Sequence, residues 1–203
     1  MERSDRGALM SGDKEEIRRH MQLIRRNVAP EIARESGYLI LRRFLDVFPV
    51  RPAPGEYITL YSAVQGEPDL CAAAGMLFER GWSVALPRTE GEEIRFFSWR
   101  PGDVLSRGRM GIAEPAAGAA PVTAEKIRGM LIPGLAFSLE GDRIGFGKGY
   151  YDRYLRALPE SARPLLVGTA YAFQVLPTLP SDSNDMAMNL VLTPENTFSA
   201  ENE

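Results

Sequence analysis

The sequence predicts an α/β fold: a single three-layer domain in which a mainly parallel sheet is flanked by helices. Three observations favour this fold class. Residues 57–86 contain a strand pattern, a short helical pattern and a second strand pattern, and such a unit joins parallel strands through a right-handed crossover. Further strand patterns follow toward the C-terminus, with a helical pattern among them, as in layered α/β domains. A length of 203 residues is enough for one domain with a sizeable core.

The N-terminal part predicts two helices. Asp13 and Glu16 form a capping-box-like start for the first helix. Lys14 and Arg18 are four residues apart, so they would stack on neighbouring turns of that helix. Apolar residues at helical spacing form one stripe beside them: Ile17, Met21, Ile24 and Val28.

The second helix is predicted to begin at Pro30 and to end before the proline-rich connector 49–55. Further helices are expected at residues 68–80 and 150–158. Apolar and β-branched runs predict strands at 57–61, 82–86, 94–99, 129–137, 165–170 and 190–192. Loops are expected at 100–111 and 114–121, and frayed tails at 1–12 and 196–203.

The composition excludes several classes of protein. A net charge of −3 gives no general attraction to nucleic acid or to an anionic membrane. The single cysteine, Cys71, excludes an internal disulfide and a cysteine zinc site, and the single histidine, His20, argues against a Ser-His-Asp triad. The sequence has no apolar run that could span a bilayer, and residues 1–12 lack an apolar signal-peptide core. We therefore expect a reducing, cytoplasmic location.

The most informative segment is Arg-Ile-Gly-Phe-Gly-Lys-Gly-Tyr-Tyr-Asp-Arg at residues 143–153. Its alternate glycines leave the backbone amides unshielded, and Arg143 and Lys148 add positive charge, so the segment suits a polyphosphate. It lies between a strand pattern and a helical pattern, an order that places a phosphate at a helix N-terminus. The glycines are Gly145, Gly147 and Gly149.

Two common phosphate-binding motifs do not fit this segment. The Walker A motif would require glycine in place of Asp142 and serine or threonine in place of Gly149. The dinucleotide motif would require a glycine one position after Gly149. The loop is therefore of another kind.

The chain resembles the 5-formyltetrahydrofolate cyclo-ligases, also called methenyltetrahydrofolate synthetases. The resemblance is carried by Pro133-Gly-Leu-Ala-Phe137, followed by Gly141-x-Arg143-x-Gly145-x-Gly147-Lys148-Gly149-Tyr150-Tyr151-Asp152. Lys14-x-x-x-Arg18, Tyr61 followed by Glu67, and Gly111-Ile-Ala-Glu114-Pro115 are also similar to the family, so the match covers most of the chain. One departure is Ser138, where the family usually has Asp.

The resemblance implies an ATP-dependent ligase of folate metabolism. Such an enzyme converts 5-formyltetrahydrofolate to 5,10-methenyltetrahydrofolate and releases ADP and phosphate. ATP is a co-substrate, the formyl oxygen is phosphorylated before the ring closes, and Mg²⁺ is the cofactor. The implied partners are these small molecules, without nucleic acid, membrane or an obligate protein partner.

The resemblance also implies roles for single residues. The catalytic residues would be Arg143 and Lys148, at the phosphoryl group that is transferred. ATP would be bound by Lys14, Arg18, Arg143, Gly145, Gly147, Lys148, Gly149, Tyr150 and Tyr151. The folate would contact Tyr61, Glu67, Phe146, Gly147, Lys148, Gly149 and Tyr150. Magnesium would be held by Asp152 and Asp185, because it prefers hard oxygen ligands.

Simpler structural roles remain open for several of these residues. Glu67 could be an acid at the start of the helix expected at 68–80, where it would face the helix dipole. Tyr150 and Tyr151 could serve only to pack their helix. Lys14 and Arg18 could lie on a solvated helix face, and Asp185 could be an ordinary loop residue.

Two other functions also remain open. One is ATP-dependent activation of a different formamide or carboxamide, against which the retained Glu67 argues. The other is a sensor that binds nucleotide or folate without turnover. A sensor would be expected to lack a metal ligand or the loop lysine, and Asp152, Asp185 and Lys148 are all present.

Overall fold

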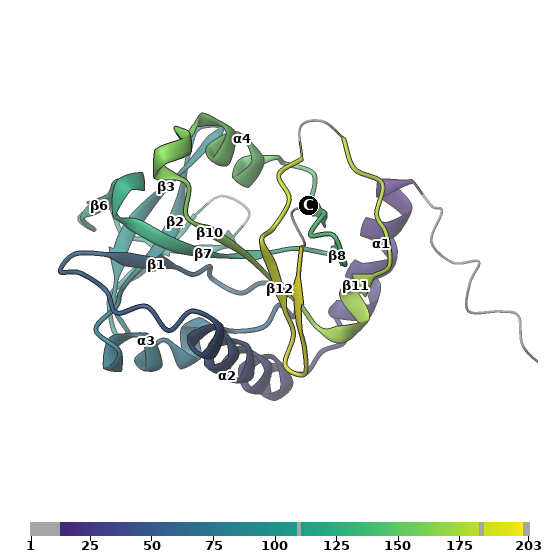
Figure 1. Ribbon diagram of the computed structural model, residues 1–203, viewed down its shortest axis with the longest axis horizontal. Helices are drawn as coiled ribbons and strands as arrows, with labels where there is room; N and C mark the ends of the chain where they lie inside the picture. The colour runs from purple at the N-terminus through teal and green to yellow at the C-terminus, as the bar shows by residue number, and fades with distance from the viewer. Residues whose placement is uncertain (1–12, 109–110, 183–184, 201–203) are drawn as a thin grey trace, which may run out of the picture.

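The computed structural model describes residues 13–108, 111–182 and 185–200, and its centre is an eight-stranded sheet (Figure 1). The strands of this sheet are β1 (Tyr57–Thr59), β2 (Ser83–Glu90), β3 (Glu93–Trp99), β6 (Pro121–Val122), β7 (Ile127–Pro133), β10 (Leu165–Thr169), β12 (Leu190–Leu192) and β13 (Thr197–Ser199). Their order across the sheet is β13-β12-β10-β7-β1-β2-β3-β6. Every pairing among β12, β10, β7, β1 and β2 is parallel, whereas β13, β3 and β6 pair antiparallel. The predicted fold class, with a mainly parallel sheet, is confirmed.

Helices cover both faces of the sheet. The α-helices are α1 (Lys14–Arg25), α2 (Pro30–Val47), α3 (Gly75–Glu79) and α4 (Tyr150–Ala157). The 3₁₀ turns are η1 (Cys71–Ala73), η3 (Ala124–Lys126), η4 (Glu160–Ala162) and η5 (Ala172–Gln174). Figure 1 shows α2 and α3 below the sheet and α4 above it. None of the helices in the described ranges has the length and apolar character that crossing a membrane requires.

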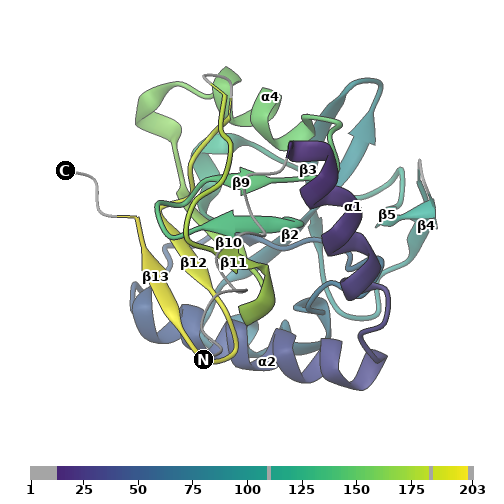
Figure 2. The ribbon, with the colours of Figure 1, turned by 90° about the vertical axis from the view of Figure 1, so that its right-hand side faces the viewer.

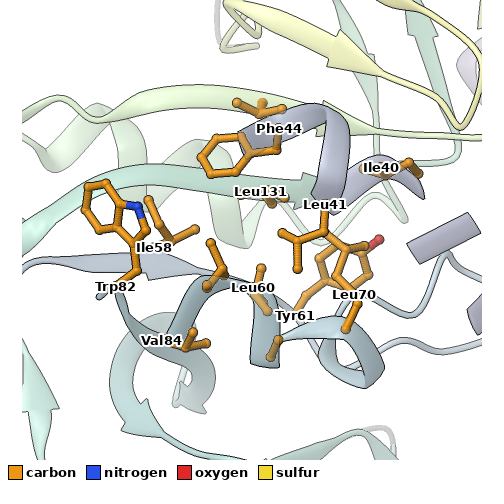
Figure 3. Close-up of a cluster of buried hydrophobic side chains, with 14 of the residues drawn as sticks. Ile40, Leu41, Phe44, Ile58, Leu60, Tyr61, Leu70, Trp82, Val84 and Leu131 are labelled. Carbon is orange, nitrogen blue, oxygen red and sulfur yellow. The ribbon is translucent and has the colours of Figure 1, made fainter. Parts of the chain in front are cut away.

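The core has two parts because successive side chains of a strand point to opposite faces. On β7, Leu131 packs in the cluster that includes Ile40 and Phe44 of α2 (Figure 3). Its neighbours Met130 and Ile132 belong to the cluster on the other face, which includes Leu155 of α4. The continuous apolar run of β7 is thus explained by burial on both faces.

Helix α1 differs from its predicted pattern at its C-terminal end. Ile17 and Met21 are buried as expected, but α1 ends at Arg25, and the expected Ile24 is 38% exposed. The third inward side chain is Arg25, four residues after Met21 and fully buried. The apolar stripe therefore ends in a buried cation.

The helix predicted at 68–80 is broken into η1 and α3. The backbone N–H of Asp69 donates to the carbonyl of Ala33 in α2, at 2.8 Å. The Tyr61 hydroxyl donates to the carbonyl of Pro68, at 2.9 Å. These tertiary bonds take the place of helical ones, so regular α-helix begins only at Gly75.

The strand predicted at 129–137 is also interrupted, because β7 ends at Pro133. Beyond it, β8 (Ala136–Ser138) joins a second sheet with β9 (Arg143–Ile144) and β11 (Val175–Leu176), in the order β11-β8-β9. Helix α1 packs on this small sheet, as Figure 2 shows, with Ile17 and Met21 clustering against Leu135 and Ile144. The glycine segment therefore follows β9 and not the main sheet.

Parts of the predicted loops and tail are strands. β4 (Leu105–Arg107) and β5 (Ala113–Pro115) pair with each other, and β6 begins at the last residue of the second predicted loop. The expected frayed tail at 196–203 is wrong for 197–199, because β13 pairs antiparallel with β12. Residues 1–12 and 201–203 lie outside the described residues. The division of the chain into one domain stays a prediction.

The buried ring of Phe137 holds β8 in place because two glycines leave room for it. A Cβ atom on Gly134 would lie 2.6 Å from the Phe137 Cζ atom, and one on Gly168 would lie 2.4 Å from Cε1. Both distances are shorter than real contacts allow, and Phe137 is fully buried. These glycines therefore fix where the chain leaves the main sheet.

We predict that Gly168→Ala destabilises the protein by about 1–3 kcal/mol, because the added methyl group must displace a buried ring. Urea denaturation followed by circular dichroism would measure the change in the free energy of unfolding. Gly75→Ala is the matched control: no atom lies within 4 Å of its added Cβ, and its φ lies outside the left-handed region. Equal stability of the two variants would contradict this account of Phe137.

Candidate functional site

A cavity of about 310 Å³ lies where β1 and β7 end, beside α1 and the start of α4. Ligands bind at the carboxyl ends of parallel strands in many α/β folds. Every site residue that the sequence predicted lines this cavity: Lys14, Arg18, Tyr61, Glu67, Arg143, Gly145, Phe146, Gly147, Lys148, Gly149, Tyr150, Tyr151, Asp152 and Asp185. Other lining residues include Ser62, Val64, Pro87, Thr89, Ile94, Ile112, Glu114, Pro133, Ile144 and Asp182.

The glycine loop, residues 145–149, connects β9 to α4 along one wall of the cavity. Gly147 and Gly149 have φ of 86° and 65°, values that side chains other than glycine rarely adopt. Gly149 is the N-cap residue of α4. At Gly145 a Cβ would lie 2.7 Å from an Arg143 Nη atom, so close packing is the reason for glycine there. The loop is thus kept free of side chains at three positions.

The cations around the loop come from separate elements. Arg18 of α1 donates from Nε to the carbonyl of Gly145, at 3.0 Å. Arg143 of β9 lies 2.8 Å from Asp152 of α4, and its side chain is only 6% exposed. Lys148 is exposed, and among the residues that the structure describes no carboxylate pairs with it. Lys148 is therefore the cation most free to meet an incoming anion.

Lys14 is held by two carboxylates from the segment before β12. Its ammonium group contacts Asp182 at 2.6 Å and Asp185 at 2.5 Å. Burial alone would lower the pKa of Lys14, but its hydrogen bonds to the two carboxylates raise that pKa above its ordinary value. Burial would raise the pKa of Asp185, but the bonds from Lys14 and from the Asp182 backbone hold it below its ordinary value. Both groups are therefore charged at neutral pH.

The two predicted magnesium ligands, Asp152 and Asp185, both face the cavity, and each is paired with a cation. Within the described ranges, no group of three or more His, Cys, Asp or Glu residues could hold a metal ion. Two carboxylates from different elements nevertheless suit Mg²⁺, which usually keeps several waters and takes further oxygens from phosphates. The donor set therefore fits Mg²⁺ bound together with a nucleotide.

Glu67 is a buried acid, only 3% exposed, and it does not begin a helix. One carboxylate oxygen accepts a hydrogen bond from the Val64 backbone N–H at 3.0 Å, and the other lies 3.3 Å from Arg25. Burial raises the pKa of Glu67 to about 7, although the Arg25 charge opposes that rise. The helix-dipole explanation of Glu67 is therefore wrong, and its partner is Arg25.

The aromatic residues of the site line the cavity and also pack in the protein interior. The Tyr61 hydroxyl is buried and bonded to Pro68 and to Thr169, so its ring is what remains for the cavity. Tyr150 and Tyr151 line the cavity and also pack against the core cluster on the α4 face. Packing is therefore shown for both tyrosines, and their role in ligand binding stays a prediction.

The sequence interpretation did not identify Arg25 or Asp182, and it gave Glu114 no role. Arg25 could have been found from its spacing, because it lies eight residues after Ile17 on the same helix face. Glu114 is 6% exposed and accepts a hydrogen bond from the Thr89 hydroxyl at 2.8 Å. Asp182 gave no sequence signal, because its role depends on a contact with Lys14 across 168 residues.

Ser138, where the family pattern usually has Asp, is fully buried at the end of β8. Its hydroxyl donates to the Asp142 carboxylate and accepts from the Asp142 backbone N–H, both at 3.0 Å. The serine therefore closes the turn that leads into β9.

Comparisons with known proteins point to one family. Residues 10–194 match the model of the 5-formyltetrahydrofolate cyclo-ligase family. The 5-formyltetrahydrofolate cyclo-ligase of Mycolicibacterium smegmatis is 29% identical over 90% of this chain and 94% of its own length. That of Escherichia coli K12 is 28% identical over 84% of this chain and 94% of its own.

Solved structures show the same fold. The structure of Aquifex aeolicus 5,10-methenyltetrahydrofolate synthetase matches with a TM-score of 0.78 and 32% identity, over 94% of each chain. A 5,10-methenyltetrahydrofolate synthetase from Mycoplasma pneumoniae matches with a TM-score of 0.71 at 22% identity, over 90% of this chain and 99% of its own. The second similarity supports the fold alone.

The raised pKa of Glu67 predicts a pH-dependent effect of Glu67→Gln on stability. A raised pKa means that the fold favours protonated Glu67, so this contribution is complete below about pH 4.5 and is lost as pH rises to about 7. The free energy of unfolding of Glu67→Gln, relative to the unmodified protein, should therefore rise over this window by at most about 1.4 kcal/mol per pH unit. Urea denaturation at several pH values would measure it. A difference that stays constant from pH 4.5 to 7.5 would contradict the assignment.

Proposed function

Since the chain belongs to the 5-formyltetrahydrofolate cyclo-ligase family, we propose that it converts 5-formyltetrahydrofolate and ATP to 5,10-methenyltetrahydrofolate, ADP and phosphate. The observation that supports this most is the single cavity that collects every predicted ligand-binding residue. These residues come from α1, the segment after β1, β9, the glycine loop, α4 and the segment before β12. A cytoplasmic location stays a prediction.

The proposed chemistry has two steps. The formyl oxygen attacks the γ-phosphorus of ATP, so an O–P bond forms and the bond to ADP breaks. The neighbouring anilino nitrogen then attacks the activated formyl carbon, loses its proton and closes the five-membered ring. The C–O bond breaks and phosphate departs. The protein must align the two substrates and offset the charge of the phosphates.

The glycine loop and the surrounding cations fit that task. Lys148 is exposed beside Gly147 and Gly149 and has no carboxylate partner among the described residues, so it can approach phosphate oxygens directly. Arg143 is already oriented by Asp152, which would hold its guanidinium rigid while charge develops on the transferred group. We assign catalytic roles to these two cations.

Arg18 and Lys14 would bind the nucleotide from the other side of the loop. Arg18 is tied to the Gly145 carbonyl and needs no large movement to present its remaining N–H groups. Lys14 is engaged by Asp182 and Asp185, so it can donate to a phosphate only by exchanging one of these bonds. Nucleotide binding should therefore rearrange this ion-pair cluster.

Magnesium would be held by Asp152 and Asp185, together with phosphate oxygens and water. When bound, the ion would offset phosphate charge. Each of the two carboxylates is already paired with a cation, Asp152 with Arg143 and Asp185 with Lys14.

The folate would lie on the side of Tyr61, Glu67 and Phe146. Val64 contacts one carboxylate oxygen of Glu67 and Arg25 contacts the other, so the direction of the carboxylate is fixed. This suits the recognition of adjacent N–H donors on a pterin ring. Tyr61 and Phe146 would supply apolar contacts to the flat ring.

We predict turnover when the purified protein is mixed with 5-formyltetrahydrofolate, ATP and Mg²⁺. Near-ultraviolet absorbance would follow the methenyl product, and a coupled assay would follow phosphate, with equal amounts of the two expected. Phosphate release without the absorbance would favour a different formamide or carboxamide substrate. Nucleotide binding with neither signal would favour a sensor.

We predict that Lys148→Ala and Asp152→Ala each lower kcat/KM by about 100-fold or more, because each removes a group placed at the phosphates. Steady-state kinetics with ATP varied would measure the loss, and circular dichroism would check that the fold is kept. Lys126→Ala, at an exposed lysine of η3 outside the cavity, is the matched control. Near-normal turnover of either site variant would refute its assigned role.

A further inference from the structure

Arg25 lies directly behind the wall of the cavity without being part of it. Its side chain is fully buried, yet it is not among the residues that line the cavity. Nη1 donates to the Gly134 carbonyl at 2.8 Å, Nε donates to the Gln65 carbonyl at 3.0 Å, and Nη2 lies 3.3 Å from Glu67. A buried guanidinium with three such contacts acts through its neighbours and not on a substrate.

The loop that carries Glu67 is shaped against the end of α1. Gln65 has a φ of 49°, which is uncommon for a residue other than glycine, and its carbonyl accepts the bond from Arg25. A Cβ on Gly66 would lie 2.1 Å from the backbone oxygen of Arg25, so the loop and the end of α1 are in close contact there. The Tyr171 hydroxyl holds the same loop through the Gly66 carbonyl, at 2.9 Å. Arg25 therefore fixes the backbone from which Glu67 projects.

Arg25 also reaches the glycine loop. Its guanidinium lies 5.1 Å from the centre of the Phe146 ring, within the range of a cation–π contact. Phe146 lines the cavity and is 36% exposed. Arg25 thus braces two cavity residues, Glu67 and Phe146, from behind.

Among the described residues, Arg25 is the charged side chain that acts on Glu67, and Glu67 in turn acts on tyrosines from three segments. Tyr61 after β1, Tyr151 on α4 and Tyr171 before η5 all have pKa values raised by burial, so they are neutral near pH 7. Asp69, two residues after Glu67, acts on Tyr171. Arg25 is therefore the cation that opposes the rise in the pKa of Glu67 that burial causes.

We propose that Arg25 is a positioning residue for folate recognition, which fixes the direction of Glu67, favours its charged form and holds the ring of Phe146. The proposal rests on the proposed function, in which Glu67 accepts hydrogen bonds from the pterin. It gives the C-terminal end of α1 a role on the folate side, whereas Lys14 and Arg18 at its other end serve the nucleotide.

The kinetic test compares Arg25→Met with Arg25→Lys. Loss of the cation should raise the pKa of Glu67, so the acid limb of the kcat/KM profile for 5-formyltetrahydrofolate should move up by one pH unit or more in Arg25→Met. The KM for 5-formyltetrahydrofolate should rise at least 10-fold, while the KM for ATP changes less than 3-fold. Arg25→Lys should restore part of both effects. Arg26→Met, at the exposed neighbouring residue, is the matched control.

A second comparison removes Glu67 itself. In Glu67→Gln the acid limb should disappear, and adding Arg25→Met should not change the pH profile further. The proposal would be overturned if the acid limb of the kcat/KM profile did not move in Arg25→Met. It would also be overturned if the KM values for 5-formyltetrahydrofolate and for ATP rose equally. If Arg25→Met does not fold, the smaller shift expected of Arg25→Lys carries the same test.

The last measurement is independent of turnover. The carboxyl ¹³C shift of Glu67 can be titrated by NMR in the protein without substrates, with Glu67→Gln identifying the signal. Arg25→Met should titrate at least one pH unit higher than the unmodified protein. If the titration shifts but the protein shows no turnover, the effect of Arg25 on the pKa of Glu67 is supported and the result counts against the proposed function. Turnover without the shift would count against Arg25.

Discussion

The position of the site depends on one junction, Gly134 and Leu135, where the backbone leaves the main sheet. The amide group of Gln174 donates to both of their carbonyls at 2.9 Å, and Arg25 donates to the first of them. The Leu135 N–H donates to Ile144 at 2.7 Å, which starts the small sheet. Without this junction, β7 would continue as a straight strand and the glycine loop would not lie over its end.

Charge in the cavity is nearly balanced before any ligand is bound. Lys14 faces two aspartates, Arg143 faces one, and Arg25 faces Glu67. Such pairing limits the cost of burying charged groups and fixes their directions. In the proposed function a triphosphate would have to exchange partners within this network, and Lys148 would be the exposed cation that starts the exchange.

Local patterns in the sequence were sufficient where a structure depends on near neighbours. The parallel strands, the helix starting at Pro30 and the glycine loop were predicted from apolar runs and glycine spacing, whereas cavity residues outside the loop, such as Lys14 and Glu67, came from the resemblance to the family. Local patterns failed where contacts with distant segments determine the structure. The bond from Asp69 to Ala33 breaks an expected helix, and the burial of Arg25 depends on loops that contact α1 from 40 and 109 residues away.

Both edges of the large sheet are closed by very short antiparallel strands. One edge is β6, which has two residues and contains Pro121, and the other is β13, which has three. A proline cannot donate a backbone hydrogen bond, and a strand this short offers little template for another chain. The C-terminal residues 197–199 therefore protect the parallel sheet against pairing with a second molecule, and removing them would uncover β12 as a site for self-association.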